Sequence, residues 1–457
     1  NLYAAWVEQL FDYPIDEDIT WTDLQTLLTN RDNNLLFDHF GTNEDERLNL
    51  HPDCADLPYF LRAYFSWKMS LPFAFRRCSR GRAGVAPHCN DLNTNHVERG
   101  GVDAAASFSV FIRSVANGVH SASARTVPQD DATDVYPIPI ERSAIRPGTV
   151  YADPYGHLLV VAGWVPQGTE QYGIMLGADA QPDGTIGRRR FWRGSFLFSP
   201  ETDDVGAGFK AFRPVVYDRA SETMSSLDNR TLARTRAHVR FSTDQYEGTV
   251  DDFYDRMEAL INPRPLDPEV RMVTLIDALD EGVARRLVSM NNGVAYQDAH
   301  GWATIDMPTG YAIFETTGPW EDFSSPARDM RLLISIDAVI GFPDAVGRVP
   351  EQFGLTADAA PAAVAALGAR LTEILAERSF EYTKSNGEAQ TLTLGDVVAR
   401  KAAFEMSYNP NDCIEVRWGA PTDSEEYASC RRHAPREHRD RMTRYREWFQ
   451  NRRRPAR

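Results

Sequence analysis

The chain has 457 residues, more than one hydrophobic core usually organises, so two or three domains are expected. Hydrophobic residues make up 42% and charged residues 25%, as in soluble globular proteins, and no apolar run approaches the ~20 residues that span a bilayer. The net charge of −16 argues against general nucleic-acid binding. The sequence therefore predicts neither a transmembrane segment nor a nucleic-acid partner.

The charge is unevenly distributed, because the C-terminus is strongly basic. Residues 431–457 contain eleven Arg against Glu437, Asp440 and Glu447, a balance of +8 that leaves −24 on residues 1–430. Such a tail could contact an anionic surface such as phospholipid, lipopolysaccharide or a wall polymer. The simpler alternative is a solvated terminal helix docked on the acidic body.

The first fifty residues are predicted to form a helical N-terminal extension. Apolar residues recur at helical spacing from Leu2 to Leu10 and from Trp21 to Leu28. The chain starts with Asn-Leu-Tyr and without Met. A removed N-terminal segment, for which a signal peptide is one candidate, would account for that start.

A buried helix is predicted to follow Cys54. Apolar residues between Pro58 and Met69 recur every three to four positions, which makes one apolar face. Asp53 is a good N-cap, and Pro58 fits only in the first turn because it lacks an N–H. Cys54 is therefore expected at the start of this helix.

Strand signals begin near Pro147, after a stretch at 79–146 that is rich in small and polar residues and includes a short predicted helix at 104–119. Turn residues at 153–156 separate the first two strands, which favours a hairpin. Together the strands predict an antiparallel meander. The four predicted strands are Gly148–Ala152, His157–Trp164, Tyr172–Ala178 and Arg189–Phe198.

Beyond a soft boundary at 215–250 the pattern is mostly helical. Strand character is predicted only for Gly301–Thr317 and Met330–Ile340. The predicted helices are Asp251–Ile261, Pro268–Asn291, Ala359–Ser379 and Leu394–Met406.

The five cysteines are Cys54, Cys78, Cys89, Cys413 and Cys430. Pairing Cys78 with Cys89 and Cys413 with Cys430 closes two short loops and leaves Cys54 alone, although four cysteines allow three pairings. An odd cysteine in an oxidising compartment is either a mate for another chain or a reactive thiol. A metal site at Cys78, His88 and Cys89 is the weaker alternative, since the tight spacings of structural zinc sites are absent.

A thiol is a useful nucleophile only as thiolate, and its ordinary pKa of about 8.5 leaves little thiolate at neutral pH. A helix N-terminus and a nearby imidazole both favour the anion. Cys54 is expected at a helix N-terminus, and its backbone N–H is the expected hydrogen-bond donor to the oxyanion. His157 is the best candidate base, because Leu158 to Val161 would anchor it in a sheet. Asp179 or Gln181 could orient its ring, and Asp179 is favoured.

These segments resemble the NlpC/P60 peptidases. Residues 53–57, Asp-Cys-Ala-Asp-Leu, resemble the family's D-C-S-G-L opening, and Leu71-Pro72-Phe73 resembles the segment after its nucleophile helix. Residues 146–150 and 156–161 resemble its L-x-P-G-D and G-H-V strands. Asp56 stands where the family usually has Gly, and Thr149 replaces its usual Asp. The likeness covers roughly residues 50–200.

The resemblance implies a papain-like core, in which an N-terminal nucleophile helix packs on an antiparallel sheet. With the helical pattern that follows, the expected fold is α+β, with this core joined to a large mostly helical C-terminal region. The domains would be an extension at 1–50, a catalytic domain at 51–215 with an insertion at 79–146, and a C-terminal domain at 216–457 with the basic tail. The implied activity is hydrolysis of a peptide or amide bond, often in peptidoglycan stem peptides, in the periplasm or outside the cell. Cys54 would be nucleophile, His157 base and Asp179 the orienting residue, with no metal or organic cofactor.

Two alternatives stay open. Transglutaminase-like enzymes use Cys, His and Asp in the same chain order, and an amine then resolves the thioester instead of water. A papain-like fold could also persist as a catalytically silent binding or scaffold module.

Overall fold

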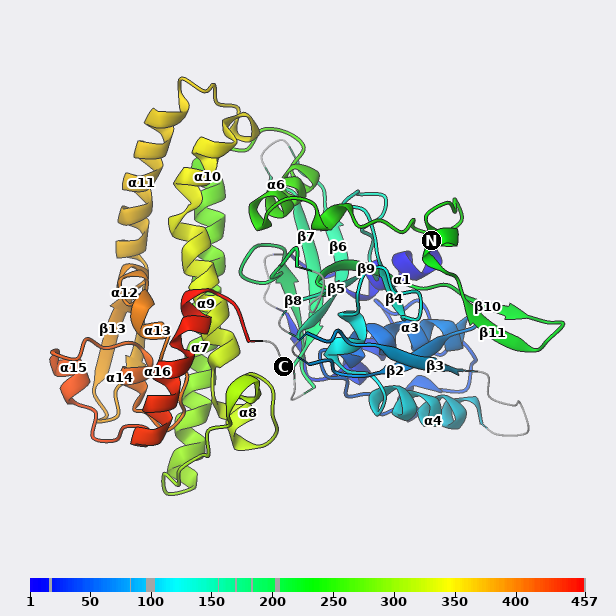
Figure 1. Cartoon of the computed structure of the whole chain (residues 1–457), viewed down its shortest axis with the longest axis horizontal. Coiled ribbons are helices and arrows are strands. Elements are labelled where there is room, and N and C mark those ends of the chain that lie inside the picture. The colour runs from blue at the N-terminus through cyan, green and yellow to red at the C-terminus, as the bar shows by residue number, and fades with distance from the viewer. Residues whose placement is uncertain are drawn as a thin grey trace. The chain divides into compact units, whose positions relative to one another are not determined.

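The computed structural model divides the chain into two compact units, Asn1–Pro263 (unit 1) and Arg264–Arg457 (unit 2), whose elements are labelled in Figure 1. Tyr155 of the predicted 153–156 turn and residues 96–102 of the predicted insertion lie outside the described residues. The structure describes residues 1–15, 19–82, 84–95, 103–154, 156–168, 171–181, 184–201 and 206–455.

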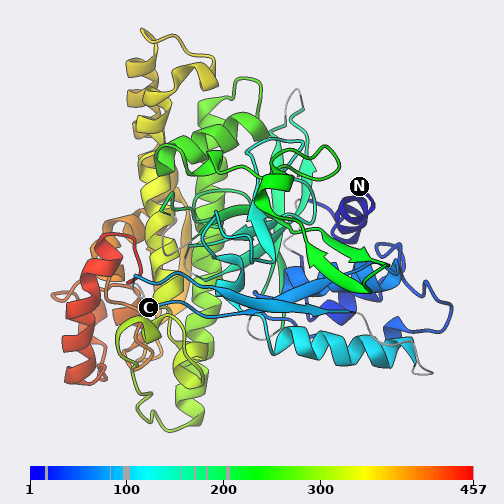
Figure 2. The same ribbon diagram turned by 45° about the vertical axis from the view of Figure 1, so that its right-hand side comes forward.

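Unit 1 is built on a seven-stranded antiparallel sheet in the order β1-β8-β7-β6-β5-β9-β4. The predicted meander is present as β5 to β8, and the chain is a mixed α and β protein with antiparallel sheets. Two separate hairpins, β2–β3 and β10–β11, lie side by side in both ribbon views (Figures 1 and 2). The strands are β1 (Thr20–Trp21), β2 (Ala74–Cys78), β3 (Cys89–Thr94), β4 (Val135–Pro137), β5 (Val150–Ala152), β6 (Leu158–Val165), β7 (Ile174–Ala180), β8 (Ile186–Arg190), β9 (Gly208–Phe212), β10 (Val215–Asp218) and β11 (Thr223–Ser226).

The fourth predicted strand is wrong beyond Arg190, because the chain leaves the sheet there. Its aromatic residues are core residues instead: Phe196 is fully buried and Phe198 stacks on Phe253 with ring centroids 3.7 Å apart. The aromatic residues that favoured a strand are therefore buried in the core, although this part of the chain forms no regular strand.

Helices cover both faces of this sheet, which explains the continuous apolar run in β6. Val160 packs in a cluster with side chains of α1 to α4, whereas Leu159 and Val161 pack in a second cluster with Phe253 of α6. Because neither face of such a strand is exposed to solvent, its sequence does not alternate between apolar and polar residues. The helices are α1 (Leu2–Leu10), α2 (Leu24–Leu28), α3 (Asp56–Lys68), α4 (Ala104–Ala116), α5 (Asn229–Leu232) and α6 (Val250–Ile261), with 3-10 turns at Asp45–Arg47, Ser121–Ala124 and Asp244–Tyr246.

The division after Pro263 lies later in the chain than the predicted 215/216 boundary. Leu232 and the buried side chains of α6 pack in the core cluster on one face of the sheet, so residues 216–263 belong with unit 1. The first fifty residues are likewise part of this unit. β1 pairs with β8, and Trp6 of α1 lies in the same core cluster as α3.

A buried lysine joins α3 to the loop that precedes it. Lys68 Nζ lies 2.5 Å from Glu44 Oε1 and 2.6 Å from Asp45 Oδ2, and the side chains of the three residues are essentially unexposed. Tyr64 donates to Asp45 over 2.6 Å. The ammonium also lies 4.9 Å from the Trp67 ring centroid, close enough for a cation–π contact.

Unit 2 is mostly helical, around the 32-residue helix α7. Met330–Ile340, predicted as a strand, lies within α9, and Gly301–Thr317 contains a 3-10 turn instead of a strand. The elements are α7 (Pro268–Ala299), α8 (Pro319–Phe323), α9 (Pro326–Ile340), α10 (Phe342–Arg348), α11 (Ala360–Glu377), β12 (Ser379–Thr383), β13 (Ala389–Thr393), α12 (Leu394–Ala399), α13 (Lys401–Phe404), α14 (Ile414–Arg417), α15 (Glu425–Ala428) and α16 (Arg436–Gln450), with 3-10 turns at Gly310–Ile313 and Pro350–Phe353.

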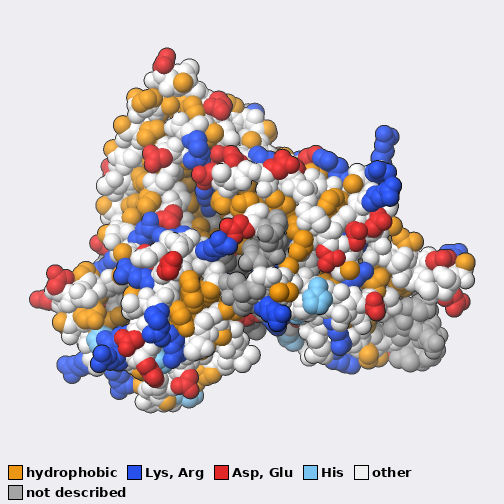
Figure 3. All heavy atoms as spheres, in the orientation of Figure 1, with side chains coloured by type: hydrophobic (Ala, Val, Ile, Leu, Met, Phe, Trp, Pro, Cys, Tyr) orange, Lys and Arg blue, Asp and Glu red, His pale blue; other side chains and the backbone are white. Residues whose placement is uncertain are grey.

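The basic tail forms α16, which is docked on unit 2. Met442 and Phe449 are buried, and Arg446 pairs with Glu405 over 2.6 Å, so part of its charge is used inside the unit. Other arginines, among them Arg439 and Arg444, are exposed. Figure 3 shows Lys and Arg side chains gathered over this helix.

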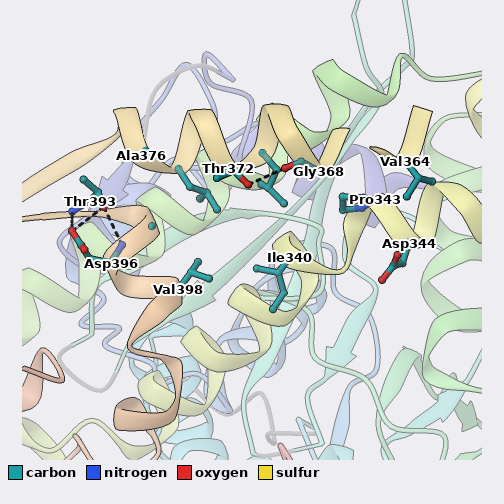
Figure 4. Close-up of a pocket in the computed structure, with 13 residues that line it drawn as sticks. Ile340, Pro343, Asp344, Val364, Gly368, Thr372, Ala376, Thr393, Asp396 and Val398 are labelled. Atoms are coloured by element: carbon teal, nitrogen blue, oxygen red, sulfur yellow. Dashed lines mark hydrogen bonds between the residues drawn. The ribbon is translucent and has the colours of Figure 1, made fainter. Parts of the chain in front are cut away.

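A cavity of about 610 Å³ lies between α11 and the facing parts of α9, α10 and α12 (Figure 4). Its walls are mainly apolar, with Ile340, Val364 and Val398 among them. Two of its polar residues already have partners: Thr372 donates to Gly368, and Asp396 accepts from Thr393.

Replacing Lys68 with Met should destabilise unit 1 by about 3–5 kcal/mol, because Glu44 and Asp45 would keep buried charges without their cation. Arg47→Met is the matched control. Arg47 pairs with Asp103 at the surface, where both side chains are more than 40% exposed, and its loss should cost less than about 1 kcal/mol. Urea unfolding of both variants measures the difference, and equal effects would contradict the role given to Lys68.

Candidate active site

Cys54 lies in the turn that leads into α3, where Asp53 accepts the first backbone N–H groups. The Asp53 carbonyl accepts from the Leu57 N–H over 3.1 Å, and its Oδ1 accepts from the N–H groups of Ala55 at 2.8 Å and Asp56 at 3.0 Å. The regular helix is assigned from Asp56. The thiol is thus held at the positive end of the helix dipole, where an anion is favoured.

His157 immediately precedes β6 and is placed by the tight turn that enters this strand. The Asp153 N–H donates to the His157 carbonyl over 2.8 Å, and Gly156 has φ 99°, a conformation that favours glycine. The Gly156 carbonyl oxygen lies 3.9 Å from the Cys54 sulfur. Residues about a hundred positions apart therefore meet at this turn.

Asp179, near the end of β7, accepts a hydrogen bond from the His157 ring. Nε2 of His157 lies 2.8 Å from Asp179 Oδ2, and because an ionised carboxylate can only accept, Nε2 carries the proton. This leaves Nδ1 as the basic nitrogen. Gln181, the other residue considered for this role, donates to the same oxygen over 3.0 Å and so supports Asp179.

Arg189 of β8 is a site residue that the sequence interpretation missed. Its Nε lies 3.2 Å from Oδ1 and 3.3 Å from Oδ2 of Asp179. Asp179 pairs with Gly187 across the two strands, so Arg189 is its diagonal neighbour on the same face. The run of three Arg at 188–190 was the available signal, but only the strand register says which one reaches Asp179.

Asp56, two residues after Cys54, carries a proton at neutral pH. Its side chain is nearly buried, and burial together with the negative charge of Asp53 raises its pKa to about 8, although a backbone hydrogen bond opposes the shift. A protonated carboxyl places no negative charge beside the thiol, whereas an ionised one would oppose thiolate formation.

The other four cysteines form the two predicted disulfides, Cys78–Cys89 and Cys413–Cys430, and Cys54 takes part in neither. The alternative metal site at Cys78, His88 and Cys89 is wrong, because its sulfurs are bonded to each other. Glu415 lies close to Cys413 and Cys430, close enough for the three to share a metal ion, but that pair is also closed as a disulfide.

Comparison of the chain with family models, with curated proteins and with solved structures finds no match. Within the ranges that the structure describes, no helix is both long and apolar enough to cross a membrane. The described residues that line the cavity of unit 2 all belong to unit 2.

The pKa of Asp56 predicts a pH-dependent loss of stability. The folded state keeps this proton up to about pH 8 while the unfolded chain releases it near pH 4, so stability should fall as pH rises between these values, by at most about 1.4 kcal/mol per pH unit. Asp56→Asn cannot ionise, so it should flatten the profile and be the more stable protein at pH 9. Urea unfolding at pH 5, 7 and 9 tests this. The exposed Asp12→Asn is the control, and a D56N profile parallel to that of the control would refute the assignment.

Proposed function

We propose that this chain is a cysteine hydrolase of papain-like design that cleaves a peptide or amide bond through a thioester. One arrangement carries the proposal. The Cys54 thiol, at a helix N-terminus, lies 3.9 Å from the carbonyl oxygen of Gly156, the residue before His157, and the His157 ring hydrogen-bonds to a nearly buried carboxylate over 2.8 Å. A thiol, a base and an orienting carboxylate are the parts that nucleophilic acyl transfer needs.

In this reaction His157 Nδ1 takes the proton of the Cys54 thiol, and the thiolate attacks the substrate carbonyl carbon. The C–N bond then breaks, and His157 gives its proton to the departing amine, which leaves an acyl thioester on Cys54. Water next attacks the thioester while His157 accepts its proton, and the C–S bond breaks to release the acid and restore the thiol. Asp179 holds the ring orientation and stabilises the imidazolium.

The resemblance to NlpC/P60 peptidases extends the proposal to substrates such as peptidoglycan stem peptides. An antiparallel meander that carries the histidine after a helix that carries the cysteine supports this reading. A periplasmic or secreted location belongs to the same proposal, since disulfides persist in oxidising compartments. The exposed arginines of the tail would suit contact with an anionic surface there.

Alkylation of Cys54 tests the proposed activation without any knowledge of the substrate. At pH 6 an ordinary thiol is only roughly 0.3% thiolate, so a thiolate paired with His157 should react with iodoacetamide on the order of 100-fold faster than glutathione. His157→Ala should remove most of this advantage, as followed by intact mass.

Two variants control that experiment. Cys54→Ala should take up no label, and the exposed His39→Ala should leave the rate unchanged. A wild-type rate equal to that of glutathione would defeat the enzymatic proposal and favour the silent binding module.

A second candidate, a transglutaminase-like acyl transferase, is favoured by the identity of the third residue. It is the carboxylate of Asp179, and not the amide of Gln181, that accepts from His157. The two candidates share the thioester and differ only in what resolves it.

Partition of the acyl group between water and an amine separates the candidates. Because a hydrolase directs water, which is the solvent, to the thioester, we expect the acid to be the main product when a peptide substrate is incubated with millimolar primary amine. Mass spectrometry of the products, with Cys54→Ala as blank, measures the ratio. A predominant amide product would select the acyl transferase instead.

A further inference from the structure

Arg189 uses only part of its hydrogen-bonding capacity beside the candidate catalytic residues. A guanidinium has five N–H donors, and here Nε alone contacts Asp179. The terminal nitrogens make no hydrogen bond to any residue that the structure describes, and the side chain is 18% exposed. The unused donors thus lie close to the site, on a side chain that is partly exposed.

The neighbouring arginines of β8 are used differently. Arg188 donates through Nη1 to the Tyr13 carbonyl over 2.8 Å and through Nη2 to the Pro14 carbonyl. Arg190 donates through Nη2 to the Ile15 carbonyl over 3.0 Å. Both hold the N-terminal segment, whereas no such backbone contact occupies the terminal nitrogens of Arg189.

The guanidinium of Arg189 extends over Gly187, the residue opposite Asp179. A Cβ on Gly187 would lie 3.5 Å from Arg189 Nη2 and 3.7 Å from Asp179 Oδ1, which are ordinary contact distances. Beside this glycine, Asp179 accepts from His157 and from Arg189 at once.

We propose that Arg189 determines specificity by binding a carboxylate on the leaving-group side of the substrate. This inference rests on the proposed function. His157 protonates the departing amine, so that amine lies at the imidazole, and Arg189 shares the carboxylate that holds this imidazole. The terminal Nη groups can donate to a carboxylate, because a guanidinium group binds a carboxylate through two parallel hydrogen bonds. The favoured substrate is an amide whose amine portion carries an unblocked carboxylate.

Paired alkylating reagents test this at Cys54 itself. Iodoacetate and iodoacetamide react with thiolates by the same displacement of iodide and differ in a carboxylate. We expect the iodoacetate-to-iodoacetamide rate ratio of Cys54 to exceed that of glutathione about 10-fold, and Arg189→Gln to bring it to the glutathione value. Arg190→Gln, the matched control, removes a charge from the same strand and should keep the wild-type ratio.

The outcomes separate specificity from positioning. If Arg189→Gln slows both reagents equally and shifts the pH profile of the iodoacetamide reaction, Arg189 only positions Asp179 and the carboxylate proposal is overturned, while the hydrolase proposal stands. An unchanged ratio overturns it as well. If wild-type Cys54 reacts with iodoacetamide no faster than glutathione, the proposed function fails and the substrate inference fails with it.

A substrate pair extends the test to turnover. Two substrates would carry the same acyl group, joined by an amide bond to glycine in one and to glycinamide in the other. The wild type should cleave the acylglycine, which has the free carboxylate, about 10–100-fold more efficiently in kcat/KM, as charged hydrogen bonds of this kind allow. Arg189→Gln should lose this preference mainly through a higher KM for the acylglycine. Equal cleavage of both substrates by the wild type would contradict the inference.

Discussion

The pairing register of β7 against its two neighbours is the constraint on which the candidate site depends. Val160 of β6 pairs with Ala178, one residue before Asp179, and Gly187 of β8 pairs with Asp179 itself. A slip of one residue would turn Asp179 to the other face of the sheet. Close packing of the β6 side chains in a separate cluster on each face opposes such a slip, so the packing of the core also sets the geometry of the site.

The nearly buried carboxylate of Asp179 then accepts from donors on both sides at once. Asp179 receives the imidazole N–H from one adjoining strand and the guanidinium Nε from the other. An ionised carboxylate in such surroundings is costly unless several donors satisfy it, and here Gln181 supplies a third. Transient protonation of His157 would strengthen this cluster, because the imidazolium forms against a fixed negative charge.

The parts of this site that sequence alone could predict are those encoded by short-range patterns. Asp53 and Pro58 mark the start of α3, and the spacing of the other cysteines isolates Cys54. His157 and Asp179 were predicted from their positions beside apolar strands. Arg189 was not, because its role depends on how two strands are aligned, and no local pattern states that alignment.

The failures of sequence reasoning at the level of the fold have a common cause. The apolar run at Met330–Ile340 is compatible with a buried strand and with a buried helix. In the folded protein the segment packs as part of the helix α9. The division between the units lies later than the predicted boundary because α6, which follows that boundary, packs back on the sheet of unit 1. Pairing between distant segments leaves little trace in the composition of either one.

The two residues of β1 cover the edge of β8 near the strand's start, at Ile186 and Gly187, and Arg188 and Arg190 anchor the chain before β1. A fragment confined to residues 51–215 would lack this cover and also α6. The edge of β8 would then expose unpaired backbone N–H and C=O groups, and the aromatic side chains on the face that α6 covers would be exposed to water. Both changes favour self-association. The shortest piece of this polypeptide that can fold around the candidate site on its own is therefore close to the whole of unit 1.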